Sequence, residues 1–167
     1  MITPNSVDKN IFNLILSLLE SAKKRDNDEL KYMNEMHNRV VDTNNNIIRI
    51  KDNKSIHYSN KNIVLYNQLQ ELFGNSKLVL DCFYKLKYNV GDYSHPHTDS
   101  YSDQTSLLLL SDNFTGGDFT LDSKQVNFNK KSMFVNFDST KKHSVSEVLT
   151  GHRVVLVMLF QKKIKKA

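Results

Sequence analysis

Apolar residues recur at helical spacing in the first part of the chain. Between residue 8 and about residue 24 they follow the i, i+3, i+4, i+7 pattern, which predicts an amphipathic helix with Ser6 as a candidate N-cap. A second helix is expected to begin near Asn27 or Asp28, and a third to run from about Lys61 to Phe73. The apolar positions are Ile11, Leu14, Ile15, Leu18 and Leu19, then Leu30, Met33, Met36 and Val40, then Leu65, Leu69, Leu72 and Phe73.

A polar, Asn-rich segment separates the last two helices, and the pattern changes to short β-rich runs after residue 76. The segment 42–60 predicts a loop with a marginal strand at its apolar patch, 47–50. Turn residues then separate eight candidate strands, which are 77–88, 95–99, 105–110, 118–121, 125–128, 132–137, 143–148 and 153–160.

A helical lead-in followed by about eight short strands favours an α+β fold. We expect a double-stranded β-helix, or jelly roll, with the N-terminal helices packed outside it. At 167 residues the chain predicts a single domain. Residues 1–76 would form the helical lead-in and polar loop, 77–161 the jelly-roll core and 162–167 a basic tail.

Composition places the chain among ordinary globular proteins, with 39% hydrophobic and 25% charged residues and a net charge of +5. The one cysteine, Cys82, lies in an apolar run, which predicts a buried thiol and a reducing compartment. The longest apolar stretch, 154–160, is too short to span a bilayer, and the N-terminus lacks a signal-peptide pattern. We therefore expect a soluble cytoplasmic protein without membrane association. The oligomeric state and the role of the basic tail do not follow from the sequence.

His97 and Asp99 are two residues apart on a predicted strand, so their side chains point to the same face and can reach one ion. His143, in a later strand, can supply a third ligand. Two imidazoles and one carboxylate form the ligand set of a non-haem Fe(II) site with open coordination positions.

Two other interpretations of these histidines stay open. His95 is also two residues from His97, so a cupin-like set of His95, His97 and His143 is an alternative. The other is that none of these residues binds a metal. The remaining histidines are expected at the surface; they are His37, His57 and His152.

Arg153 opens the last apolar strand and shares its inward face with Val155, Val157 and Leu159. A charge on such a row is costly unless it meets an anion. The planar guanidinium matches the geometry of a carboxylate, so Arg153 predicts a carboxylate ligand. The alternative is an arginine at the rim with its charge in water.

This combination resembles the Fe(II)/2-oxoglutarate-dependent dioxygenases, and most closely their prolyl-4-hydroxylase-like branch. The resemblance covers about residues 77–161, roughly half of the chain. Residues 1–76 match nothing in the family, which leaves substrate specificity unsupported. The matching features are Tyr88, the Pro-His-Thr-Asp segment 96–99, the apolar strand 107–110, the Gly-Gly-Asp-Phe segment 116–119, the Phe-Val-Asn-Phe segment 134–137, His143 and the Gly-His-Arg segment 151–153.

The resemblance implies roles for five residues. His97, Asp99 and His143 would be the catalytic residues that bind Fe(II). Arg153 would pair with the C5 carboxylate of 2-oxoglutarate, and Tyr88 would hydrogen-bond the same co-substrate. O₂ would be the oxidant, and ascorbate is allowed as a reductant.

The resemblance also implies the reaction, which is hydroxylation of a C–H bond with release of succinate and CO₂. A prolyl residue in a protein or peptide is the expected substrate. Small-molecule or nucleic-acid oxygenases and a non-catalytic cupin-like binding module remain alternatives. Nucleic acid is not favoured as a partner, because nucleic-acid repair members of the superfamily typically carry a second arginine where this chain has Leu159.

Overall fold

The computed structural model describes residues 2–26, 54–99 and 101–163. The predicted second helix, the apolar patch 47–50, His37 and the end of the basic tail from residue 164 lie outside the described residues.

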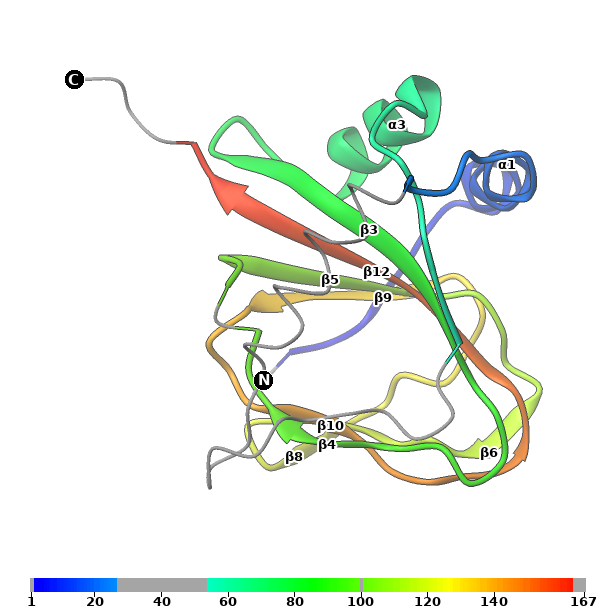
Figure 1. Ribbon diagram of the computed structural model, residues 1–167. Helices are drawn as coiled ribbons and strands as arrows, with labels where there is room; N and C mark the ends of the chain where they lie inside the picture. The colour runs from blue at the N-terminus through cyan, green and yellow to red at the C-terminus, as the bar shows by residue number, and fades with distance from the viewer. Residues whose placement is uncertain (1, 27–53, 100, 164–167) are drawn as a thin grey trace.

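A six-stranded antiparallel sheet forms one layer of the protein (Figure 1). The strand order is β1-β9-β5-β12-β3-β2. The long pair β3–β12 lies within it, and Arg153 at the start of β12 is opposite Tyr88 at the end of β3. The strands are β1 (Asn5–Ser6), β2 (Lys54–His57), β3 (Leu78–Tyr88), β5 (Gln104–Leu109), β9 (Met133–Asp138) and β12 (Arg153–Lys162).

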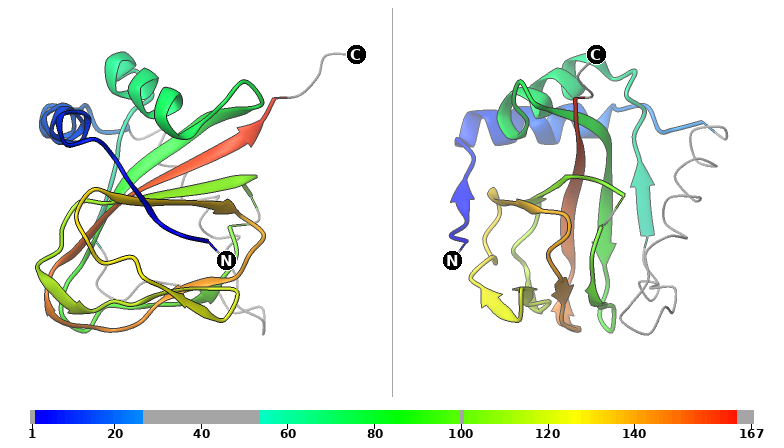
Figure 2. Two further views of the ribbon diagram at one scale, coloured as in Figure 1. Left: turned by 180° about the vertical axis from the view of Figure 1, so that it is seen from behind. Right: turned by 90° about the vertical axis from the view of Figure 1, so that its left-hand side faces the viewer.

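Two smaller antiparallel sheets lie opposite the large one (Figures 1 and 2). One has four strands in the order β4-β10-β7-β8, and the other pairs β11 with β6. These facing antiparallel sheets are consistent with a jelly-roll-like fold. The strands are β4 (Ser94–His97), β6 (Phe114–Gly116), β7 (Phe119–Leu121), β8 (Lys124–Val126), β10 (His143–Val145) and β11 (Val148–Gly151).

Two helices, α1 (Lys9–Glu20) and α3 (Ile63–Phe73), cover the face of the large sheet that points away from the small sheets (Figure 2). Alternation along β12 assigns its side chains to two cores. Leu156 and Met158 belong to the core under the helices, whereas Val155 and Val157 belong to the core between the sheets. The helix residues buried in the first core are Phe12, Ile15, Leu19, Leu65, Leu69 and Phe73.

All eight predicted strand ranges overlap a strand of the structure, and the short strands β1, β2, β6 and β11 were not predicted. The range 143–148 was predicted as one strand, but β10 ends at Val145 and β11 begins at Val148. The predicted N-cap is wrong. Ser6 pairs with Met133 in β1, and Asp8 Oδ1 accepts from the backbone N–H of Asn10 at 3.0 Å.

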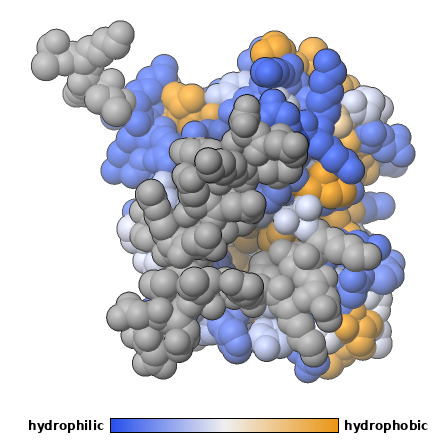
Figure 3. Space-filling model, in the orientation of Figure 1, coloured by the Kyte–Doolittle hydropathy of each residue, from blue (hydrophilic) through white to orange (hydrophobic). Residues whose placement is uncertain are grey.

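Neither described helix is long and apolar enough to cross a membrane. The visible described surface in Figure 3 is mostly hydrophilic, with apolar areas interrupted by polar ones. Scattered exposed apolar residues of this kind are common on globular proteins. Among the described residues, the large hydrophobic side chains that are exposed are those of Leu14, Ile63, Val64, Val90 and Leu149.

Candidate metal centre

Strand pairing brings together the three residues that the sequence predicts as metal ligands. His97 ends β4, His143 begins β10, and the two residues are directly opposite each other in the β4–β10 pair. Their ring centroids are 4.2 Å apart. Asp99 follows β4 by two residues, and the ligand atoms of all three side chains lie within 4.8 Å of one another. The strand register therefore places the two imidazoles together, and Asp99 joins them from the segment that follows β4.

Both imidazoles present the same nitrogen to the centre. His97 Nδ1 lies 2.7 Å from the backbone oxygen of His95, and His143 Nδ1 lies 3.0 Å from that of Lys141. A carbonyl oxygen can only accept, so each Nδ1 carries the proton and donates it. The two Nε2 atoms therefore face Asp99 with their lone pairs available to a metal once they are unprotonated.

The Asp99 carboxylate is buried between these imidazoles. Its Oδ2 lies 3.1 Å from His143 Nε2, and its Oδ1 lies 3.7 Å from His97 Nε2. Burial by itself raises the pKa of the Asp99 carboxyl, but the hydrogen bond from His143 and the charges of both histidines hold that pKa below its usual value. Asp99 is therefore ionised near neutral pH, as a metal ligand must be.

The pKa values of the two histidines shift in opposite directions. Burial lowers the pKa of His97, and the neighbouring charge of His143 lowers it further. Burial also lowers the pKa of His143, but hydrogen bonding and attraction to Asp99 outweigh burial and raise it above its usual value. A proton on His143 Nε2 would bridge to Asp99, and a divalent cation would compete with that proton.

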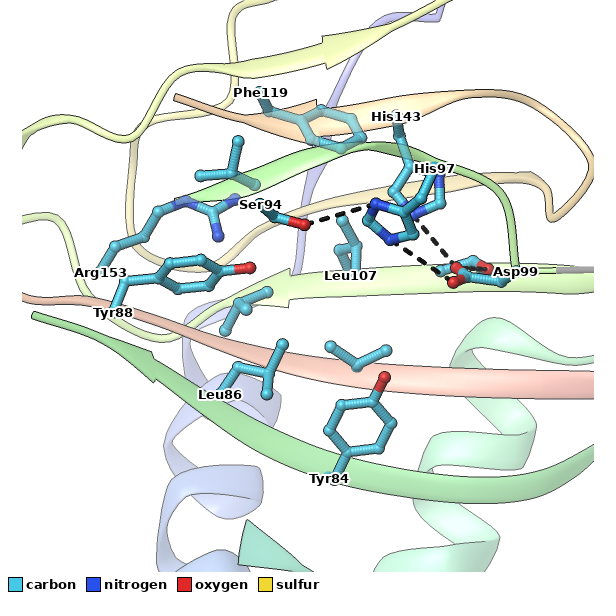
Figure 4. Close-up of a pocket in the computed structure, with 14 residues that line it drawn as sticks. Tyr84, Leu86, Tyr88, Ser94, His97, Asp99, Leu107, Phe119, His143 and Arg153 are labelled. Carbon is cyan, nitrogen blue, oxygen red and sulfur yellow. Dashed lines mark hydrogen bonds and ion pairs between the residues drawn. The ribbon is translucent and has the colours of Figure 1, made fainter. Parts of the chain in front are cut away.

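The triad lines one end of a cavity between the sheets (Figure 4). The cavity volume is about 70 Å³, several times the roughly 10–15 Å³ that one water requires. Arg153 and Tyr88 line the other end, and Figure 4 shows the guanidinium and the phenol directed into the cavity from β12 and β3.

Arg153 is 1% exposed, and no charged partner lies against it among the described residues. Its Nε and Nη2 atoms are buried and have no hydrogen-bond partner in the described part of the chain. The guanidinium carbon lies 5.2 Å from the ring centroid of Tyr88 and 5.9 Å from that of Phe128. Burial lowers the pKa of Arg153, and Tyr88 opposes this shift. An arginine nonetheless stays protonated in proteins, so one end of the cavity holds a buried positive charge.

Gly117 makes room for the Arg153 side chain. Its φ is +60°, and a Cβ at this position would lie 3.0 Å from Arg153 Cδ and 3.2 Å from Val148 Cγ2. Glycine adopts this backbone conformation without steric cost and leaves the space that the arginine stem uses.

Burial raises the pKa of Tyr88, which is 3% exposed. The Tyr88 phenol is therefore a neutral hydroxyl that can donate a hydrogen bond to an anion beside Arg153.

The other described histidines lie apart from the centre. His95 is exposed, with its ring packed against Tyr93 at 4.8 Å between centroids, so the structure does not bring the cupin-like set together. His152 is exposed as predicted. The surface prediction for His57 is wrong, because β2 pairs with β3 and buries His57 against the Tyr84 ring at 4.8 Å.

Thr105 belongs to the site but was not predicted. It lines the cavity, and its Oγ1 donates to Asp99 Oδ2 at 3.0 Å. One sequence signal marks it, since Thr105 is the polar member of an inward row that continues with Leu107 and Leu109.

No protein-family model matches the sequence, and a search of curated proteins finds no match. Solved structures do share the fold. One is an oxidoreductase of the 2OG-Fe(II) oxygenase family from Burkholderia pseudomallei, with a TM-score of 0.58 and 12% identity over 94% of this chain and 93% of that one.

Two prolyl hydroxylases are similar to the same extent. The viral collagen prolyl hydroxylase of Paramecium Bursaria Chlorella virus-1, in its 2OG complex, has a TM-score of 0.60 and 10% identity over 98% of this chain and 96% of that one. The prolyl hydroxylase of Trichoplax adhaerens, in complex with a hypoxia inducible factor peptide fragment, has a TM-score of 0.59 and 14% identity over 96% of this chain and 82% of that one. At these identities the likeness is one of fold, and at that level the resemblance predicted from the sequence is confirmed.

Proposed function

We propose that the protein is an Fe(II)- and 2-oxoglutarate-dependent oxygenase that hydroxylates a C–H bond. One observation carries this proposal. A single cavity holds the His97, Asp99 and His143 cluster at one end and, at the other, a buried Arg153 with two nitrogens that have no hydrogen-bond partner among the described residues. A co-substrate with a metal-chelating end and a distal carboxylate is complementary to both ends.

In this proposal the triad holds the metal and leaves coordination positions open. His97 and His143 would bind through Nε2, because each Nδ1 is committed to a backbone oxygen. Asp99 would bind as a carboxylate. Three ligands on one side of an ion leave room for a bidentate co-substrate and for O₂.

Arg153 and Tyr88 would bind the distal carboxylate. Arg153 offers a charged fork in a low-dielectric cavity, where a charge-assisted hydrogen bond is stronger than in water. Tyr88 would add a neutral donor. When bound, iron and 2-oxoglutarate supply the oxidising chemistry, in which O₂ is reduced, 2-oxoglutarate becomes succinate and CO₂, and one oxygen atom enters the substrate C–H bond.

A prolyl residue in a protein or peptide is the substrate that we propose. Two of the solved structures that share this fold are prolyl hydroxylases, and one of them holds a peptide. A shared fold alone is weak support for a substrate, so the substrate is a separate question from the cofactor chemistry.

The first test of the proposal is binding and turnover of 2-oxoglutarate by the purified protein. We expect Fe(II)-dependent binding of 2-oxoglutarate and Fe(II)-dependent succinate formation, both lost in Asp99→Ala. Asp112→Ala is the control, because Asp112 is exposed and does not line the cavity. Failure of the wild-type protein to bind 2-oxoglutarate with Fe(II) would refute the proposal.

The substrate is tested next with proline-containing peptides. Mass spectrometry should show the addition of one oxygen atom to a prolyl residue, together with faster succinate formation. If succinate formation depends on iron but no proline peptide accelerates it, the proposed oxygenase activity stands and the proposed prolyl substrate is rejected.

A further inference from the structure

Three buried hydroxyl groups form a continuous chain behind the Asp99 carboxylate. Thr105 Oγ1 donates to Asp99 Oδ2 at 3.0 Å, and Ser139 Oγ lies 2.9 Å from Thr105 Oγ1. Ser102 Oγ lies 2.8 Å from Ser139 Oγ. Thr105 and Ser139 are 0% exposed and Ser102 is 6% exposed. The chain is therefore shielded from solvent along its length.

The positions of the protons in this chain follow from counting. Each hydroxyl has one proton, and an ionised carboxylate can only accept, so the Thr105 proton lies toward Asp99. Thr105 Oγ1 must then accept from Ser139, so the protons of Ser139 and Thr105 both point toward the carboxylate. Ser102 Oγ can donate to Ser139 Oγ or to the Asp99 backbone oxygen at 3.2 Å, which also accepts from the Ser102 N–H at 3.0 Å.

The same residues also hold the backbone that carries Asp99. The Asp99 N–H donates to the Ser139 carbonyl oxygen at 2.9 Å, and the Ser139 N–H donates to the Asp103 carbonyl oxygen at 3.1 Å. Ser139 thus holds the segment 99–103 at both ends. The backbone of Asp99 is thus anchored to Ser139, which follows β9, and its carboxylate is anchored to Thr105 on β5.

We infer that Thr105, supported by Ser139 and Ser102, is a positioning residue that fixes the orientation of the Asp99 carboxylate for the metal. This inference rests on the proposed function and extends its site. The terminal torsion of an aspartate is soft, so the carboxylate plane is set by what hydrogen-bonds to it. Aligned hydroxyls polarise one another and strengthen the last bond of the chain. Supporting residues of this kind typically contribute 10- to 100-fold to metal affinity.

The alternative is that Thr105 only fills space. It lies at the start of an apolar row, where valine has nearly the same shape. A purely structural role therefore predicts that Thr105→Val leaves metal binding unchanged, whereas a positioning role predicts a loss that Thr105→Ser restores.

The test is a titration of the metal-free protein with Mn²⁺, with the free ion measured by electron paramagnetic resonance. We expect Thr105→Val to weaken Mn²⁺ binding by about 10- to 100-fold, and Thr105→Ser to restore the wild-type affinity. Ser106→Ala is the matched control. Ser106 is also 0% exposed and lies on β5, but its hydroxyl accepts from Gln104 Nε2 at 3.1 Å, away from Asp99. This control should bind Mn²⁺ as the wild type does.

Each outcome separates the inference from the proposed function. If the wild-type protein binds no Mn²⁺, both the proposed metal centre and the inference are refuted. If the wild type binds and Thr105→Val binds equally, the inference is overturned and the metal centre stands. An equal loss of Mn²⁺ affinity in Ser106→Ala would also overturn the inference. If Thr105→Val does not fold, Ser139→Ala is the second test, because it removes the hydroxyl that donates to Thr105. Wild-type Mn²⁺ affinity in Ser139→Ala would overturn the inference.

Discussion

Replacing Arg153 with methionine should stabilise the ligand-free protein and weaken its binding of 2-oxoglutarate. The two buried Arg153 nitrogens without described partners each cost about 1–3 kcal/mol. The cation–π contacts with Tyr88 and Phe128, at 5.2 and 5.9 Å, return about 0.5–2 kcal/mol each. Methionine keeps the apolar stem and removes both effects. The difference predicts a gain of about 1–2 kcal/mol in the free energy of unfolding without ligand.

The assay is thermal unfolding in the presence of Mn²⁺, with and without 2-oxoglutarate. For a chain of 167 residues, a gain of 1 kcal/mol raises Tm by about 2–4 °C. Without ligand, Arg153→Met should therefore melt above the wild type. With 2-oxoglutarate the order should reverse at high ligand concentration, because truncating one partner of a buried charge pair costs about 2–4 kcal/mol, or roughly 30- to 1,000-fold in affinity.

2-Oxopentanoate is the matched ligand control, since it has the same carbon chain and 2-oxo acid group without the distal carboxylate. It should shift the Tm of wild type and Arg153→Met equally. Two results would refute the reasoning. One is an Arg153→Met protein that is less stable than the wild type without ligand, which would mean that the guanidinium is well satisfied. The other is an undiminished preference of the variant for 2-oxoglutarate over 2-oxopentanoate.

Further predictions concern the same cavity and its surroundings. His97→Ala should abolish Fe(II)-dependent succinate formation while the circular dichroism spectrum stays that of the wild type, and retained activity would reject the ligand assignment. Gly117→Ala should raise the KM for 2-oxoglutarate by pushing on the Arg153 stem. Gly91→Ala carries the same kind of positive-φ strain at +91°, but its Cβ would meet only Glu147 Oε1 at 3.9 Å, so the KM should not change. Mn²⁺ affinity should fall as the pH drops through the raised pKa of His143, because the proton and the metal compete for Nε2; an affinity independent of pH in that range would contradict this. Burial raises the pKa of Cys82 to about 12, so its thiol should resist iodoacetamide at pH 8 in the native protein and react after denaturation.

The parts of the site that follow from local rules were predictable from the sequence. His97 and Asp99 share a face because side chains alternate along an extended chain. The same rule gives Arg153 an inward direction, and it is 1% exposed. The pairing of His143 with His97 is different, because register between distant strands does not follow from spacing. His143 was a candidate third ligand because it lies in a later predicted strand, and the resemblance to a known family implied that it binds the same metal as His97.

Other features depend on tertiary contacts that local patterns do not encode. His57 is polar and lies in an Asn-rich segment, yet pairing of β2 with β3 buries it. The helix N-cap moves from Ser6 to Asp8 because Ser6 is used in a strand. The contacts of Ser139 with Thr105 and Ser102 join residues 34 and 37 positions apart, and neither spacing is a recognisable motif.

Arg153 and Thr105 are polar residues at positions where the strand pattern predicts an apolar side chain, and they differ in their hydrogen bonding. Each occupies an inward position on a row that is otherwise apolar, and such breaks in a consistent pattern are expected at functional sites. Thr105 is fully hydrogen-bonded within the described chain, so its presence is explained by what it holds, the Asp99 carboxylate. Arg153 has buried donors that no described residue satisfies, which supports the proposal that it binds a ligand. A satisfied polar residue in a core thus indicates support for a neighbour, whereas an unsatisfied one indicates the chemistry of a ligand, and for Arg153 we propose an anion with a carboxylate end.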